Sequence, residues 1–307
     1  MCIRDRLAAD PDYQEIMSAE GDTWPLLTAL ADRADAETDG SKGGRFSFRW
    51  DLGNSRFVMI DSRNGRILDG GAHLMLGESE FGWIEEQVRD RSSGPVDHLV
   101  LGTSLPWLLP HAIGDLQSIN QIAAARSGWR GRLGETIRQL GDLEHWQAFR
   151  SSFDRLTRMI TTAATAPDAP TSINVLSGDV HHSYAAKVDL PGPGAAVHQL
   201  TCSPVHNVVD WFIQPGFRLG WSRTIARATR WWAGRAGVPP LEVSWHKLTG
   251  PLFGNTVATL DLDGKHAQVT FLQPRSAGSM TEVAKLVLAD GPRAATTGGR
   301  AALRARM

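Results

Sequence analysis

The residues best suited to chemistry in this chain follow a short apolar segment. Residues 173–178 read Ile-Asn-Val-Leu-Ser-Gly, and Asp179, His181 and His182 come directly after them. Such a run predicts a buried strand that the serine and glycine end. Asp179 and His181 are two residues apart, so in an extended backbone both side chains point the same way. A carboxylate and an imidazole together are two ligands for zinc, iron or manganese, and the remaining ligands must come from elsewhere.

A second group of charged residues follows another largely apolar segment. Residues 56–60 predict a strand, and Asp61, Arg63 and Arg66 come next. A guanidinium group binds phosphate through paired hydrogen bonds, so Arg63 and Arg66 are candidates for orienting a phosphate group. The alternative is that Asp61 pairs with Arg63 and shapes the loop, and the residues favour this alternative.

Both groups belong to a pattern in which strands and helices alternate from residue 56 to residue 177. Helical spacing predicts helices over residues 78–91 and 142–160, and residues 98–102, with three apolar residues at their centre, predict a strand between them. The alternation predicts the α/β class, in which ligands bind beyond the carboxyl ends of the strands. Residues 112–141, rich in glycine, arginine and alanine, are expected to form a mobile surface excursion with one helical turn.

After residue 177 the pattern changes. Residues 185–201 predict two neighbouring strands, and residues 255–272 predict a hairpin around the Asp-Gly dipeptide at 263–264. Residues 274–307 are rich in Ser, Gly, Ala and Arg, and we expect a poorly ordered tail with one helix near residues 283–288.

Residues 211–237 contain several arginines and tryptophans, Trp231 and Trp232 among them, but no acidic residue. This composition is typical of a helix that lies in a membrane interface. It is equally typical of a helix on the protein core that arginine stems cover, and we favour this second interpretation. His111 and His206 have the chemistry of metal ligands, but we expect ordinary loop histidines at both positions.

Composition excludes several classes of protein. The chain has 307 residues, 42% of them hydrophobic and 21% charged, and a net charge of −1, which is ordinary for a soluble globular protein. No apolar run approaches the ~18 residues that a transmembrane helix needs. The near-neutral charge argues against nucleic acid as a specific partner. Cys2 and Cys202 are the only cysteines, so a disulfide framework is excluded.

The first six residues stand apart from the rest. Residues 1–6 read Met-Cys-Ile-Arg-Asp-Arg and resemble the translation of a sequencing adapter, so we exclude them from the fold. One domain is expected over residues 7–273. If the natural start is missing, the sequence does not decide between an exported and a cytoplasmic protein.

These residues carry a family resemblance. The chain resembles the C-terminal part of the PhoD-like (alkaline phosphatase D) metallophosphatases, within the calcineurin-like metallophosphoesterase superfamily. The best match is residues 177–184, Ser-Gly-Asp-Val-His-His-Ser-Tyr, which are similar to the family's Gly-Asp-Val-His segment. Together with residues 57–66, 143–146, 201–204 and 253–255, the resemblance covers about residues 45–273.

The resemblance implies a four-layer αββα sandwich with two metal ions, iron, calcium, zinc or manganese, between its sheets. It implies hydrolysis of small phosphate mono- or diesters by a metal-activated water. Asp179 and His181 would hold metal, His181 and His182 would be catalytic, and Arg63 and Arg66 would bind substrate. His182 has an alternative, because strand alternation points it into the core.

The family's early Gly-Asp and Asn-His motifs have no match before residue 60. We therefore expect the chain to be the C-terminal part of such an enzyme and to have little or no activity by itself. The competing class is a non-catalytic protein in which Asp179 and His181 form a hydrogen-bonded pair. In that class residues 211–237 dock on a membrane or on a partner.

Overall fold

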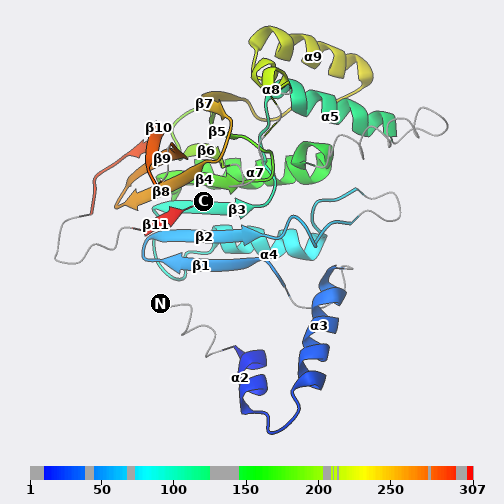
Figure 1. The fold of residues 1–307 in the computed structure, drawn as a ribbon, viewed down its shortest axis with the longest axis vertical. Coiled ribbons are helices and arrows are strands. Elements are labelled where there is room, and N and C mark those ends of the chain that lie inside the picture. Colours follow the sequence, from blue (N-terminus) through cyan, green and yellow to red (C-terminus); the bar gives the residue numbers. More distant parts are fainter. Residues whose placement is uncertain are drawn as a thin grey trace.

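A seven-stranded sheet with a parallel centre organises the structure (Figure 1). Its strand order is β1-β2-β3-β4-β6-β5-β7, and β2, β3, β4 and β6 run parallel. Its strands are β1 (Phe48–Leu52), β2 (Ser55–Ile60), β3 (His98–Thr103), β4 (Ser172–Ser177), β5 (Ser183–Val188), β6 (Ala196–Thr201) and β7 (Trp245–Leu252). This computed structural model describes residues 10–38, 45–67, 73–124, 145–202, 209, 211–212, 214–275, 278–294 and 303–306.

Both faces of the sheet are buried. Side chains alternate along each strand, so each face contributes its own set of apolar residues. On β3, Leu99 and Leu101 belong to one apolar cluster, whereas Val100 between them belongs to another. The first cluster lies under helices α4 (Glu78–Arg89) and α7 (Arg150–Thr165). The mixed α/β class predicted from the alternating pattern is therefore confirmed.

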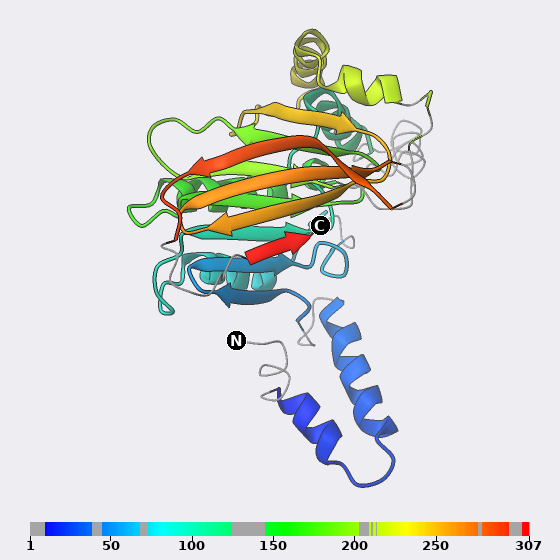
Figure 2. The same cartoon turned by 60° about the vertical axis from the view of Figure 1, so that its left-hand side comes forward.

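The second cluster joins the seven-stranded sheet to a four-stranded antiparallel sheet (Figure 2). This smaller sheet has the order β10-β9-β8-β11. Its strands are β8 (Val257–Asp263), β9 (His266–Pro274), β10 (Met280–Asp290) and β11 (Leu303–Arg306). The predicted hairpin is confirmed: Asp263 pairs with His266, and Gly264 has a φ of 60°, which suits the first position of a tight turn.

Our expectation for the C-terminal residues is wrong where the structure describes them. Residues 280–290 form strand β10 and pair with β9, in place of a poorly ordered tail with a helix at 283–288. The physical reason is tertiary: Leu288 and Ala289 are buried against the core shared by the two sheets, and this burial overrides a weak local pattern.

The remaining helices lie outside the two sheets. α2 (Pro11–Ser18) and α3 (Trp24–Thr38) extend away from the sheets in both views. The short 3-10 helix η1 (Trp146–Ala148) precedes α7. α5 (His111–Ala124) is a full helix where we expected a mobile excursion with one helical turn, and residues 125–141 lie outside the described residues.

The expected Trp/Arg helix over residues 211–237 is two helices, α8 (Gln214–Gly220) and α9 (Arg223–Ala236). Trp221, between them, is half-buried and packs edge-on against Tyr184, with the two ring centroids 5.3 Å apart. Trp231 and Trp232 are exposed, whereas Thr229 and Ala233 on the same helix are buried. Among the described residues no helix is long and apolar enough to span a membrane.

Candidate functional site

The carboxyl ends of three parallel strands meet at one edge of the seven-stranded sheet. β2 ends at Ile60, β3 at Thr103 and β4 at Ser177. Because β3 pairs in parallel with both β2 and β4, the three loops that follow lie next to one another. Arg63 and Asp179, which are far apart in the sequence, come from two of these loops.

Hydrogen bonds between hydroxyl groups and between backbone groups join the three loops. Ser62 Oγ lies 2.9 Å from Thr103 Oγ1 and 2.8 Å from Ser104 Oγ. The Ser104 carbonyl accepts a hydrogen bond of 3.2 Å from the amide of Gly178. Trp146 Nε1 donates to Thr103 Oγ1 at 3.1 Å and attaches η1 to the same network. We did not predict this network from the sequence, where its only signal is a hydroxyl residue at each strand end.

The loop between β4 and β5 has an unusual backbone. Asp179 has a φ of 59° and His181 a φ of 56°, so both lie in the left-handed region. Our expectation of an extended backbone at these residues is therefore wrong. Aspartate and histidine tolerate this region better than most residues, but each such position costs on the order of 1 kcal/mol. Backbone strain of this kind is concentrated at functional sites, so this loop is the strongest candidate on the edge.

Arg63 and Asp179 meet across the edge. An Nη of Arg63 contacts Oδ2 of Asp179, and both side chains remain partly exposed. The carboxylate of Asp61 does not pair with the guanidinium of Arg63. Its Oδ1 accepts hydrogen bonds from the backbone amides of Arg63 and Asn64, at 3.2 and 3.0 Å. The expected Asp61–Arg63 loop pair thus exists only through the backbone, which leaves the guanidinium free to reach Asp179.

Arg66 lies differently. Its Nε donates to the carbonyl of Ser62 at 3.0 Å, and its guanidinium lies 5.8 Å from the ring centroid of Phe149. These contacts direct Arg66 toward the segment between η1 and α7. The structure therefore brings Arg63, but not Arg66, into contact with a predicted metal ligand.

His182 is fully buried in an aromatic environment. Its Nδ1 donates to the Val180 carbonyl at 2.6 Å, so the proton is on Nδ1 and Nε2 carries a lone pair. Its ring centroid lies 4.4 Å from that of Phe217 and 5.3 Å from that of Tyr184. Burial lowers the pKa of His182 to about 4, and the His145 and His181 charges act in the same direction. At neutral pH His182 is an uncharged ring that packs in the core.

His145 and His111 have separate surroundings. His145 Nδ1 lies 2.8 Å from Gln117 Nε2. His111 Nε2 donates to the Trp245 carbonyl at 2.9 Å and stacks on that indole at 4.2 Å, which accounts for it structurally. His206 lies outside the described residues.

The described residues do not fit a pair of metal ions. No group of three or more His, Cys, Asp or Glu side chains in that part of the chain converges on one point. Asp179 is in contact with a guanidinium, and the Nε2 lone pair of His182 is buried without a partner among aromatic rings. Two donors on one loop provide at most half of a dinuclear centre.

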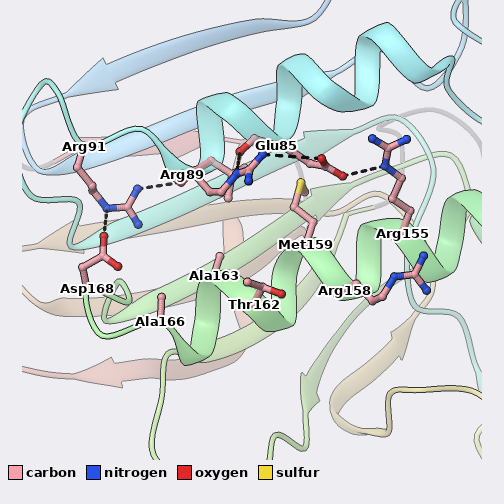
Figure 3. Close-up of a pocket in the computed structure, with 11 residues that line it drawn as sticks. Glu85, Arg89, Arg91, Arg155, Arg158, Met159, Thr162, Ala163, Ala166 and Asp168 are labelled. Carbon is pink, nitrogen blue, oxygen red and sulfur yellow. Dashed lines mark hydrogen bonds and ion pairs between the residues drawn. The ribbon is translucent and has the colours of Figure 1, made fainter.

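A cavity of about 520 Å³ lies elsewhere, between α4 and α7 (Figure 3). Arginines 89, 91, 155 and 158 line it. Arg155 pairs with Glu85 at 2.8 Å and Arg91 with Asp168 at 2.9 Å. The cavity contains none of the strand-end residues, and we do not assign the candidate chemistry to it.

Comparisons with known proteins were made at three levels. No family model, no curated protein and no solved structure matches this chain. The fold and the edge define a mixed α/β protein with a polar strand-end site, and any narrower assignment is a proposal.

Proposed function

We propose that the strand-end loops bind the phosphoryl group of a small phosphate ester and belong to a phosphoester hydrolase of the PhoD-like type. The observation that carries this proposal is the meeting of Arg63 with Asp179 beside the strained residue His181. Two candidate residues predicted for one site, 116 positions apart in the chain, are in contact.

The guanidinium group of Arg63 is exposed and can bind an anion. Its side chain is 55% exposed, and only an Nη is engaged by Asp179. A guanidinium has five N–H donors in a planar fork, so donors remain for a phosphoryl oxygen. His181 lies two residues after Asp179 on the same loop and is half-buried.

Two metal ions would supply the activated water in an enzyme of this type. The described residues provide Asp179 and His181 for them, which is too few for a pair, and we derive no hydrolytic step through metal in this chain. The two sheets that share one apolar cluster, with helices on an outer face, support the proposed αββα sandwich.

Phosphate binding and turnover test the proposal separately. We expect inorganic phosphate to bind the 307-residue chain and Arg63→Ala to weaken binding about tenfold, the value of one charge-assisted hydrogen bond. Arg89→Ala is the matched control, because Arg89 is an exposed arginine on α4. Equal affinity in the wild-type protein and in Arg63→Ala would overturn the proposal.

Turnover of p-nitrophenyl phosphate and bis(p-nitrophenyl) phosphate is measured with iron, calcium, zinc and manganese. We expect little turnover and less than two equivalents of tightly bound metal. Rapid turnover that His181→Ala abolishes would support hydrolysis and contradict the expectation of an incomplete metal site.

A further inference from the structure

Helix α9 has one buried face and one exposed face. Thr229 and Ala233 are buried, whereas Trp231, about 200° from each around the helix, is exposed. The exposed row continues at intervals of four residues through Arg223, Arg227 and Arg235. Trp232 extends this row sideways, so cationic and aromatic side chains share a single face.

The buried face fixes α9 on helix α5. Thr229 Oγ1 donates to Asp115 Oδ2 at 3.2 Å, and Arg230 forms a salt bridge of 2.7 Å with the same carboxylate. Asp115 is 2% exposed, so this is a buried anchor. Arg230 is thereby neutralised, and the outer face is held rigidly.

The outer face keeps its positive charge. No acidic residue occurs between residues 211 and 237. Arg235 lies over the Trp231 ring at 5.3 Å, where it can reach outward beside the indole. Arg223 and Arg227 are exposed on the same row. We call Arg223, Arg227, Trp231, Trp232 and Arg235 the α9 outer face.

The aromatic residues of this face are turned to solvent. Trp231 is 67% exposed and Trp232 is 54% exposed. Trp211 and Phe212, just before α8, form a second exposed aromatic pair with centroids 6.1 Å apart. Burying several large aromatic side chains favours association by a few kcal/mol, so a face of this kind is typical of an interaction surface.

We propose that the α9 outer face docks on the surface of an anionic lipid bilayer. Indole rings prefer the headgroup region, and guanidinium groups bind lipid phosphates. Two copies of this face fit each other poorly, because they would bring arginines together without any carboxylate between them.

The position of α9 suits a planar partner. In both views α9 is the outermost element at its end of the molecule, opposite α2 and α3 (Figures 1 and 2). A flat surface can therefore meet α9 without contacting either sheet.

Vesicle flotation of the full chain tests the proposal. Vesicles of phosphatidylcholine alone are compared with vesicles that contain roughly a third phosphatidylglycerol. We expect binding to the anionic vesicles only, and weaker binding at high salt. Each arginine near the surface strengthens binding about fivefold, so Arg223→Gln, Arg227→Gln and Arg235→Gln together should weaken it on the order of a hundredfold.

The aromatic contribution needs its own variants. Trp231→Ala with Trp232→Ala should lose binding at least about tenfold, whereas Trp231→Phe with Trp232→Phe should keep most of it. Trp24→Ala is the matched control, because Trp24 is 70% exposed on the remote helix α3. Circular dichroism confirms that each variant is folded.

Four outcomes would overturn the proposal, three of them in the vesicle measurements. These are equal binding to neutral and anionic vesicles, no flotation of the folded wild-type protein, and an equal loss of binding in Trp24→Ala. A concentration-dependent dimer that the Trp231/Trp232 variant abolishes would also overturn it, because the face would then be an interface between two copies. None of these measurements depends on phosphate binding at the strand ends.

Discussion

The guanidinium group of Arg63 and the carboxylate of Asp179 are in contact across the carboxyl edge of the main sheet. Arg63 follows β2 and Asp179 follows β4, and β3 lies between the two strands. The contact therefore bridges over the end of β3. It places one cationic and one anionic group where a phosphate ester would have to approach.

This ion pair should matter little for stability. Both side chains are substantially exposed, at 55% and 36%, and exposed pairs contribute about 0–1 kcal/mol. We expect a double-mutant cycle of Arg63→Ala and Asp179→Asn, measured by urea unfolding, to give a coupling below about 1 kcal/mol. A coupling above about 2 kcal/mol would show that the pair is structural and would weaken its assignment to binding.

Substitutions at the left-handed residue His181 should change the stability of the protein according to the backbone preference of the new residue. Replacing His181 by Gly removes the clash of its Cβ at a φ of 56°, and we expect the free energy of unfolding to stay constant or rise by up to about 1 kcal/mol. His181→Val, which is β-branched, should lower it by more than about 1 kcal/mol. The two variants lose the same imidazole, so thermal unfolding of the pair isolates the backbone. Equal stabilities would contradict the strain.

Two buried histidines predict a loss of stability in mild acid. Burial lowers the pKa values of His182 and His198 to about 4 each. The unfolded chain keeps a value near ~6.5, so between the two values it binds protons that the folded chain does not. Stability therefore falls as pH falls through this window, by about 2 kcal/mol per histidine at pH ~5.

His198→Leu tests this pH dependence. The substitution replaces a 2% exposed imidazole on β6 by an apolar side chain, so its share of the dependence should disappear. Urea midpoints are compared at pH 7 and at pH 5, and the m-value must stay constant for the comparison to hold. An unchanged dependence on pH would mean that His198 is protonated in the folded protein.

A buried arginine at the other end of β2 predicts strong destabilisation. Arg56 is 1% exposed and donates to Asp51 at 2.8 Å and to the carbonyls of Gln87 and Asp90. Arg56→Met removes these hydrogen bonds, while Asp51 keeps those from Arg49 and Ser93. We expect a loss on the order of 3 kcal/mol in urea unfolding, the value of a few buried hydrogen bonds to a charged group. Arg89→Met, at an exposed arginine, should cost less than about 1 kcal/mol. Similar losses in both variants would contradict this account.

The same network sets a second response to acid. Burial alone would raise the pKa of Asp51, but hydrogen bonds from Arg49, Arg56 and Ser93 outweigh burial and hold it well below its usual value. The stability from this group is therefore present above pH ~4 and is lost as pH falls further. Arg56→Met should reduce this loss, which separates it from the histidine effect at higher pH.

The sheet could be predicted because its local and tertiary signals agree. Residues 99–101 are continuously apolar, and β3 is buried on both faces, as a central parallel strand must be. β10 could not be predicted, since its pattern is weak and its partner β9 supplies the pairing. β7, also not predicted, contains Gly250 and Pro251, which local rules assign to turns.

The meeting of Arg63 and Asp179 at the strand ends could be predicted, whereas the geometry of the loops and the positions of Arg66 and His182 could not. Strand-end position was sufficient to select Arg63 and Asp179, because parallel strands bring their ends together. It was not sufficient for the loop from 178 to 182, where left-handed residues replace the expected extended backbone. The burial of His182 depends on Phe217 and Phe253, which the sequence places far away.

The hydroxyl network of Ser62, Thr103 and Ser104 separates the residues that hold the edge from the residues that could act at it. Arg63 and Asp179 project from loops that backbone and hydroxyl hydrogen bonds already secure. Their side chains can therefore be exchanged without loss of the underlying frame. In evolutionary terms, this edge can acquire or lose a reaction by point substitutions, while selection for folding acts on a different set of residues.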